Sequence, residues 1–220
     1  MIQFEDVTKI FADTQDEALS HVSFHILPGE MAFLLGESGS GKTTLLRLLL
    51  RELTADAGTV RVNGQDVGAI KNRKIPAYRR KIGFVFQDFK LLPDCSVYDN
   101  VAIGRRIAGA RERDVRFSVA MALRMVGMER EFDKPVCELS GGEQQKVGIA
   151  RAIAGSPYCI LADEPTGNLD PRQAREIMLL LERINGHGVT VLVATHDREA
   201  IRGLDHKRLY LSEGRLQSGE

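Results

Sequence analysis

The sequence has 220 residues, in which 30 lysines and arginines balance 30 aspartates and glutamates to a formal net charge of zero. That length holds one sizeable domain with a full hydrophobic core, and the neutral balance argues against a surface dominated by nucleic-acid binding. The three widely spaced cysteines disfavour a disulfide scaffold and a structural metal site, and they suit a reducing compartment. The acidic start predicts no secretory signal, and no apolar run approaches the roughly 20 residues of a membrane span. We therefore expect any membrane role to depend on a partner.

Alternating apolar and polar residues open the chain. Ile2 to Phe4 and Val22 to Ile26 have the period of two that is typical of half-buried strands, and a polar turn is expected over Ala12 to Asp16. These segments predict an antiparallel edge sheet. Phe11, at the end of the first segment, is either a packing residue or an aromatic face for a purine base.

A glycine-rich turn follows the continuous apolar run from Met31 to Leu35, a pattern typical of a central parallel strand. The turn matches G-x-x-x-x-G-K-[ST], in which glycines let backbone N–H groups curl around an anion at the start of a helix. We expect Lys42 to reach the β- and γ-phosphates of a nucleotide and the Thr43 hydroxyl to hold Mg²⁺. The alternative, a turn that binds nothing, is disfavoured by the flanking strand and helix. The predicted nucleotide-binding residues here are Gly36, Glu37, Ser38, Gly39, Ser40, Gly41, Lys42, Thr43 and Thr44.

The segment after the first helix returns to the edge sheet and then becomes basic. Thr59 to Val62, followed by Asn63-Gly64, predicts a hairpin. Residues 71–81 contain lysines and arginines and no acidic residue; a solvated helix or loop face explains them more simply than contact with nucleic acid or lipid headgroups. Ile82 to Phe86 predicts another buried strand. It ends at Gln87, whose amide suits Mg²⁺ or a water beside the γ-phosphate.

Helical periodicity replaces the strand pattern between Asn100 and Glu138. Val115, Val119 and Leu123 recur at helical spacing, which predicts a helical subdomain inserted into an α/β core. The apolar stripe is expected to serve internal packing.

The stretch from Leu139 to Gln144 then opens a long helix. Ser140 and Glu143 have the spacing of a capping box. Capping does not explain Gly141 and Gly142, because glycine in a helix costs about 1 kcal/mol per residue. We expect an anion to approach the backbone there, at a second helix N-terminus.

Charged and polar residues end two further buried strands. Tyr158 to Ala162 precedes Asp163-Glu164, and Val189 to Ala194 precedes His196. At the crevice of an open parallel sheet, Asp163 would bind Mg²⁺, Glu164 would polarise a water and His196 would sense the γ-phosphate. The alternatives are an acidic pair that caps a loop and a structural histidine. Asp170-Pro171 begins the intervening helix, and residues 209–214 predict a closing hairpin.

These motifs occur in the order found in the nucleotide-binding domains of ABC transporters, which the chain resembles over essentially its whole length. The matching residues are Gly36 to Thr43, Gln87, Leu139 to Gln144, Cys159 to Glu164, Gly167 to Asp170 and His196. The resemblance implies an α/β fold: a P-loop NTPase (RecA-like) core with a mostly parallel sheet, an antiparallel β edge subdomain and an inserted α-helical subdomain. It implies one domain, 1–220, with the β subdomain at 1–30 and 58–70, the core at 31–57, 82–88 and 156–220, and the helical subdomain at about 95–155.

The resemblance also implies an ATPase with Lys42, Glu164 and His196 as catalytic residues and Thr43, Gln87 and Asp163 around Mg²⁺. Each ATP would lie between the Lys42 loop of one chain and the signature segment of a second chain in a head-to-tail homodimer. The remaining predicted nucleotide contacts are Phe11, Gln87, Ser140, Gly141, Gly142, Gln144 and Asp170. Thr43 replaces the commoner serine and Phe11 the commoner tyrosine, and both substitutions keep the relevant chemistry.

Within the family the chain is more similar to the ATPases of bacterial cell division, on Pro28 to Leu34, Tyr78 to Gly83, Phe86 to Leu92 and Val97 to Ala102. That similarity implies a membrane protein docking near Asp88 to Tyr98, a peripheral position on the cytoplasmic side of the inner membrane, and an indirect link to peptidoglycan hydrolases. Lipoprotein-release and macrolide-export ATPases look similar, so an exporter subunit is an alternative. Two others are an ATPase that acts on nucleic acid and an ATP-gated recruitment scaffold.

Overall fold

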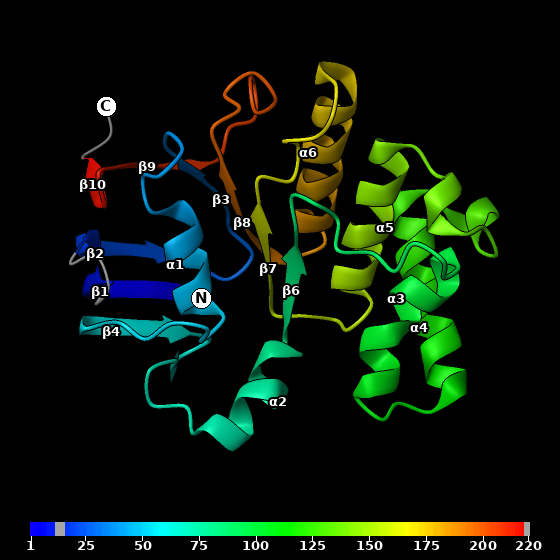
Figure 1. Cartoon of the computed structure of the whole chain (residues 1–220), viewed down its shortest axis with the longest axis horizontal. Helices are drawn as coiled ribbons and strands as arrows, with labels where there is room; N and C mark the ends of the chain where they lie inside the picture. Colours follow the sequence, from blue (N-terminus) through cyan, green and yellow to red (C-terminus); the bar gives the residue numbers. More distant parts are fainter. Residues whose placement is uncertain (12–15, 218–220) are drawn as a thin grey trace.

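The computed structural model describes residues 1–11 and 16–217, which form two sheets flanked by helices (Figure 1). The strands are β1 (Ile2–Ile10), β2 (Glu17–Ile26), β3 (Met31–Leu35), β4 (Ala57–Val62), β5 (Gln65–Asp66), β6 (Ile82–Val85), β7 (Cys159–Asp163), β8 (Thr190–Thr195), β9 (Lys207–Ser212) and β10 (Arg215–Gln217). The helices are α1 (Lys42–Leu49), α2 (Ile75–Arg79), α3 (Val97–Ile107), α4 (Glu112–Val126), α5 (Gly141–Ile153) and α6 (Pro171–Asn185). Short 3₁₀ turns cover Asn72–Lys74, Glu129–Glu131 and Val136–Glu138.

The larger sheet has the strand order β10-β9-β3-β8-β7-β6. Its strands from β9 to β6 run parallel, and β10 pairs antiparallel with β9 in the closing hairpin. The predicted mostly parallel sheet is therefore confirmed. Because parallel strands all end at the same edge, the loops that follow β3, β6, β7 and β8 lie along one edge of this sheet.

This sheet separates two hydrophobic cores, and the alternation of side chains along β3 shows the division. Met31, Phe33 and Leu35 pack with residues of α3 to α6, whereas Ala32 and Leu34 pack with α1 and the smaller sheet. Both faces are covered, so the strand is apolar throughout. Figure 1 shows α1 and α5 on opposite sides of the sheet.

The smaller sheet is antiparallel, with the order β2-β1-β4-β5, as the edge-sheet prediction requires. Strand β1 continues to Ile10, well beyond the segment that alternation indicates. The alternation of apolar and polar residues stops early because the register shifts after Phe4, where Asp6 adopts a φ of 52°. Gly58 of β4 lies against the backbone of Asp6, where a side chain would not fit. The turn expected over Ala12 to Asp16 lies, apart from Asp16, outside the described residues.

The region between β6 and β7 is helical, as the sequence predicts. Helices α3, α4 and α5 pack on one another, and the apolar stripe of α4 is buried in the larger core. Gly83 of β6 fits closely against α5, because a Cβ atom there would lie 2.7 Å from the carbonyl oxygen of Ala152. Among the described residues, no helix is long and apolar enough to cross a membrane.

Part of the basic segment 71–81 has a structural role. The Arg79 guanidinium donates hydrogen bonds to the carbonyl oxygens of Leu50 (2.8 Å) and Arg51 (3.2 Å), and the Tyr78 hydroxyl donates to that of Leu49 (2.6 Å). These carbonyls lie at the C-terminal end of α1, where helix carbonyls lack intrahelical partners and favour a cation. Burial raises the pKa of Tyr78. The segment therefore stabilises the helix that follows the phosphate loop.

Candidate functional site

The loop between β3 and α1 has the backbone that an anion cradle needs. Gly39 and Gly41 have φ angles of 80° and 107°, in the left-handed region that favours glycine. At Gly41 a Cβ atom would also lie 2.6 Å from the carbonyl oxygen of Ala18. The Ser40 hydroxyl is buried in this loop and has no hydrogen-bond partner among the described residues. An oxygen-rich anion bound in the loop would supply that partner.

Lys42, the first residue of α1, lies inside the loop that precedes it. Its side chain is 6% exposed, and Nζ donates hydrogen bonds to the carbonyl oxygens of Gly36 (2.7 Å) and Glu37 (2.9 Å). The same Nζ lies 3.4 Å from Oε1 of Glu164. The ammonium group is therefore held where the phosphate loop meets the end of β7.

Thr43 and Asp163 face each other across the same point. The Thr43 hydroxyl donates to the Asp163 carboxylate, at 3.1 Å from Oδ2 and 3.4 Å from Oδ1. Burial raises the pKa of Asp163 above its usual value, and the hydrogen bond from Thr43 opposes the shift. A hydroxyl and a carboxylate are the oxygen donors that Mg²⁺ prefers, and a cation here would favour the charged carboxylate. The two side chains therefore fit a magnesium ion.

Glu164 brings the three predicted catalytic residues together. Its Oε2 lies 3.0 Å from Nδ1 of His196 and accepts a hydrogen bond of 3.3 Å from the His196 backbone N–H, while Oε1 faces Lys42. The backbone of Glu164 has a φ of 44°, a conformation that costs about 1 kcal/mol or more in a non-glycine residue. Its N–H donates to the carbonyl oxygen of Ala194 at 2.8 Å, which ties the strained residue to the end of β8.

Gln87, just after β6, lies at the same sheet edge but with other neighbours. The Asn168 side chain donates a 3.0 Å hydrogen bond to the backbone carbonyl of Gln87. A Cβ atom on Gly167 would lie 2.9 Å from Nε2 of Gln87, so this glycine allows the glutamine to pack against the loop after β7. The described hydrogen bonds do not link the Gln87 side chain to Thr43 or Asp163.

The predicted capping box at the start of α5 is present. Ser140 Oγ accepts from the Glu143 backbone N–H at 3.4 Å, and the Ser140 N–H donates to Glu143 Oε2 at 2.8 Å. A Cβ atom on Gly142 would lie 3.1 Å from Gln173 Cδ, so packing within the chain accounts for part of that glycine. A Cβ atom on Gly141 would lie no closer than 3.5 Å to described atoms outside its own helix, which is an ordinary van der Waals contact, so packing does not require a glycine there.

The hydrogen bonds of the other predicted nucleotide contacts go to residues outside the phosphate loop. Asp170 is the N-cap of α6 and accepts from the Gln173 N–H at 2.9 Å, and Gln144 donates to the Leu139 carbonyl at 3.0 Å. Phe11 donates its backbone N–H to Asp16. In the part of the chain that the structure describes, no hydrogen bond or ion pair joins residues 140–144 to residues 36–44.

Two residues that the sequence analysis does not single out hold the loops around this edge. Gln145 is fully buried in α5, and its Nε2 donates to the carbonyl oxygens of Pro165 (2.7 Å) and Phe86 (3.3 Å). The Arg151 guanidinium donates to those of Phe89 (2.7 Å) and Lys90, and burial lowers its pKa. Gln145 lies three residues after Gly142 on the buried face of α5. A polar residue at such a core position is the sequence feature that could have indicated its role.

A phosphate loop after β3, a carboxylate pair at the end of β7 and a histidine at the end of β8 define an enzyme of the P-loop ATPase class. The family model "ABC transporter" matches residues 19–167. The "Cell division ATP-binding protein FtsE" of Escherichia coli (strain K12) is 49% identical over 219 residues, which cover 100% of this chain and 98% of that protein. FtsE of Streptococcus pneumoniae serotype 2 is 43% identical, and the match covers 100% of this chain and 95% of that protein.

A dimeric, post-hydrolysis structure of the ATP-binding cassette MJ0796 bound to ADP and Pi is similar in fold. It has a TM-score of 0.87 and 34% identity, and the match covers 100% of this chain and 98% of that chain. The chain therefore belongs to the ABC transporter family and, within it, to the FtsE cell division ATP-binding proteins. It is an ABC-type ATPase that converts ATP and water to ADP and phosphate.

Proposed function

We propose that this chain is the ATPase subunit of an FtsEX-type membrane complex in bacterial cell division. ATP binding and hydrolysis would act through an FtsX-like membrane protein on peptidoglycan hydrolases outside the membrane. The observation that carries the enzymatic part is the convergence of Lys42 and His196 on the Glu164 carboxylate. The names of full-length relatives at 43% and 49% identity support the role in cell division.

The phosphate loop would bind the ATP phosphates through its backbone N–H groups and the positive end of α1. Lys42 would exchange the carbonyl oxygens of Gly36 and Glu37 for phosphate oxygens, which are stronger partners for an ammonium group. Thr43, Asp163 and Gln87 would hold Mg²⁺, and the bound ion would supply positive charge to neutralise the β- and γ-phosphates.

Glu164 would accept a proton from the attacking water. The water oxygen forms a bond to the γ-phosphorus on the side opposite the β–γ bridging oxygen. The bond between the γ-phosphorus and that bridging oxygen breaks, and the oxygen leaves as part of ADP. His196 contacts one carboxylate oxygen of Glu164, so it would orient this base and hold the γ-phosphate from the other side. Lys42 would stabilise the charge that develops on the transferred group.

A second copy of the chain would complete the site. The start of α5 has a satisfied capping box and two glycines, which leave its backbone open to an anion, and its own phosphate loop lies across the sheet (Figure 1). Ser140, Gly141, Gly142, Gln144 and Asp170 would therefore contact the nucleotide of the partner chain. The similar cassette MJ0796 is a dimer with ADP and Pi bound, which supports this arrangement. Phe11 would stack on the base of the nucleotide bound by its own chain.

The membrane partner would dock near Asp88 to Tyr98, between the β6 end and α3. Phe89 and Lys90 have φ angles of 57° and 48°, and Arg151 holds their carbonyl groups. This loop starts one residue after Gln87, so movement of the partner would reach the nucleotide site over a short path. The chain would lie on the cytoplasmic side of the inner membrane through this contact, with residues of about 95–155 as the moving helical subdomain.

Co-purification from its own host tests the proposal. Tagged wild-type protein and the hydrolysis-impaired Glu164→Gln variant should both retain an FtsX-like membrane protein, and only the wild type should support normal division. Retention of an exporter permease instead, or normal division with the variant, would contradict the assignment.

A further inference from the structure

The outer face of α4 combines three arginines with exposed apolar side chains and has one acidic residue, Asp114. Positions at helical spacing on the side away from the core form this face, defined here as Arg113, Asp114, Arg116, Phe117, Ala120, Met121 and Arg124. The opposite side of the helix is buried. Phe117 is 70% exposed and Met121 50%, among the largest exposed apolar side chains of the described residues, and Ile107 at the nearby end of α3 is 67% exposed.

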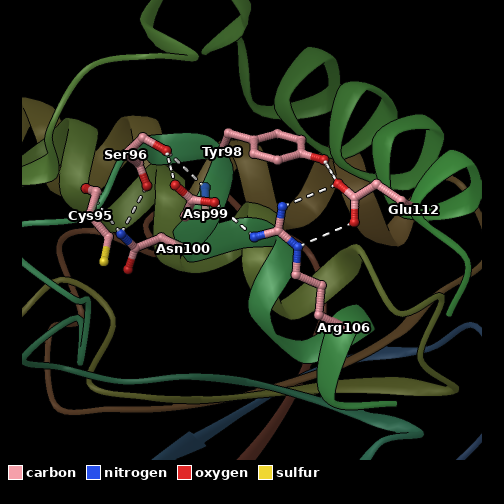
Figure 2. A network of polar contacts seen from close by, with 7 residues as sticks. All are labelled: Cys95, Ser96, Tyr98, Asp99, Asn100, Arg106 and Glu112. Atoms are coloured by element: carbon pink, nitrogen blue, oxygen red, sulfur yellow. Dashed lines mark hydrogen bonds and ion pairs between the residues drawn. The ribbon is translucent and has the colours of Figure 1, made fainter. Parts of the chain in front are cut away.

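The acidic groups at this corner are largely engaged by one arginine (Figure 2). Arg106 pairs with Asp99 at 2.8 Å and with Glu112 at 3.1 Å, and the Tyr98 hydroxyl donates to Glu112 at 2.7 Å. The hydrogen bonds from Arg106 hold the pKa of both carboxyl groups below their usual values. Arg106 therefore engages Asp99 and shares Glu112 with the outer face.

The positive charge of the outer face is only partly compensated, because three arginines face Asp114 and a Glu112 that Arg106 also engages. In the described part of the chain Arg113 and Arg124 form no ion pair, while Arg116 lies near enough to Glu112 to lower its pKa. Arg113 also borders a hollow of about 480 Å³ with Arg105, Arg111 and Asp114, where arginines outnumber the one acidic residue. The chain as a whole is neutral, so this is a local concentration of charge.

We propose that the outer face of α4 binds directly to an anionic lipid surface. Arginines next to protruding phenylalanine, methionine and isoleucine match a helix that lies in the interface, with its cations at the headgroups and its apolar side chains at the acyl boundary. Charge complementarity selects anionic lipid, and the aliphatic side chains favour a membrane over nucleic acid. Tyr98 also belongs to the segment proposed to dock the membrane partner, and its hydrogen bond to Glu112 connects that segment to the start of α4.

Vesicle sedimentation with the full chain tests the charge requirement. The wild type should bind vesicles of equal parts phosphatidylglycerol and phosphatidylcholine, and not vesicles of phosphatidylcholine alone. Each basic residue near an anionic leaflet contributes a factor of about five to binding, so Arg113→Gln/Arg116→Gln/Arg124→Gln should weaken binding roughly a hundredfold. The matched control Lys71→Gln/Arg73→Gln/Lys74→Gln changes three exposed basic residues of the other basic segment and should bind as the wild type does. Both variants should keep their ATPase activity, which checks their folding.

A fluorescence measurement tests the apolar contact separately. The chain has no tryptophan, so Phe117→Trp introduces a single reporter on this face, and Leu179→Trp places one on α6. Anionic vesicles should shift the emission of Phe117→Trp to shorter wavelength and leave that of Leu179→Trp unchanged. Three results would overturn the proposal: equal binding to neutral vesicles, full binding by the triple arginine variant, or a Phe117→Trp shift with a short DNA duplex and none with vesicles.

Discussion

His196 Nδ1 lies 3.0 Å from Oε2 of Glu164, and the His196 backbone N–H donates to the same oxygen at 3.3 Å. The end of β8 therefore contacts the proposed base through both a side chain and the main chain. Lys42 faces the other carboxylate oxygen. The position of the Glu164 carboxylate thus depends on the loops after three different strands, and changes at any of them should reach the chemistry.

The first prediction concerns Glu164 itself. Glu164→Gln keeps the shape of the side chain and removes the base, so ATP binding should persist while turnover falls by roughly 10² to 10⁴-fold. Single-turnover hydrolysis with radiolabelled ATP measures the chemical step. Glu199→Gln, an exposed glutamate that pairs with Arg202, is the matched control. A rate near that of the wild type in Glu164→Gln would remove Glu164 from this role.

Lys42→Ala should weaken nucleotide binding. The ammonium group would make charge-assisted hydrogen bonds to phosphate, each contributing about 1.5–3 kcal/mol, so affinity should fall between about tenfold and a hundredfold or more. Equilibrium binding of a fluorescent ATP analogue measures the loss, and Lys74→Ala, exposed in a 3₁₀ turn, serves as the control. Unchanged affinity in Lys42→Ala would show that the lysine stays on its carbonyl partners.

The raised pKa of Asp163 predicts a pH dependence of stability. Burial penalises the carboxylate, so the folded state binds its proton more tightly than the unfolded state does. The penalty is present in full above the raised pKa and disappears as pH falls through that value towards the ordinary carboxyl range, about pH 4. Asp163→Asn should therefore raise the melting temperature at pH 7 and have little effect near pH 4. Thermal unfolding at both pH values measures this, and Mg-ATP should stabilise the wild type more than the variant.

Arg151 should stabilise the conformation of the loop after Gln87. Arg151→Met removes the donors to the Phe89 and Lys90 carbonyls while keeping most of the side-chain volume. The loss should cost about 1–3 kcal/mol in the free energy of unfolding and accelerate hydrogen exchange in residues 88–91. Lys146→Gln, on the same helix and paired only loosely with Glu176, should have neither effect. Equal exchange in the two variants would contradict this role.

Two glycines should respond in opposite directions to alanine. Gly83→Ala would place a Cβ atom 2.7 Å from the Ala152 carbonyl oxygen, so it should destabilise the fold by about 1–3 kcal/mol. Gly104 lies in α3, and apart from its chain neighbours and the backbone of its own helix no heavy atom of the described residues lies within 4 Å of the place that an alanine methyl group would take. Gly104→Ala should therefore stabilise the fold by up to about 1 kcal/mol. Urea unfolding of both variants tests the pair, and a neutral Gly83→Ala would contradict the close packing of β6 on α5.

Local signals allow much of the fold to be predicted. The apolar run of β3, the glycines and Lys42 are contiguous, and helix caps such as Ser140 and Asp170 depend on neighbours within three residues. Strand β1 is harder to predict, because the register shift at Asp6 interrupts the alternation on which strand prediction depends. That irregularity depends on Gly58, which is distant in sequence.

The long-range part of the site is the least predictable. Gln145 and Arg151 donate hydrogen bonds to backbone carbonyls of loops that are distant in sequence. Every residue has a backbone carbonyl, so the sequence cannot indicate which one accepts the bond. The sequence pattern favours Gly142 as an opening for an anion, yet the Gln173 side chain also requires a small residue there. The basic segment illustrates the same limit, since only the structure shows Arg79 bonded to the end of α1.

ATP-dependent dimerisation tests the central claim, that hydrolysis needs the Ser140 segment of a second chain. In size-exclusion chromatography with light scattering, Glu164→Gln should become a dimer when ATP is added. Ser140→Arg/Glu164→Gln should bind ATP with unchanged affinity and stay monomeric, because the bulky cation would block the partner's nucleotide and not its own. Loss of ATP binding by the monomeric double variant, or dimerisation equal to that of Glu164→Gln, would contradict the account.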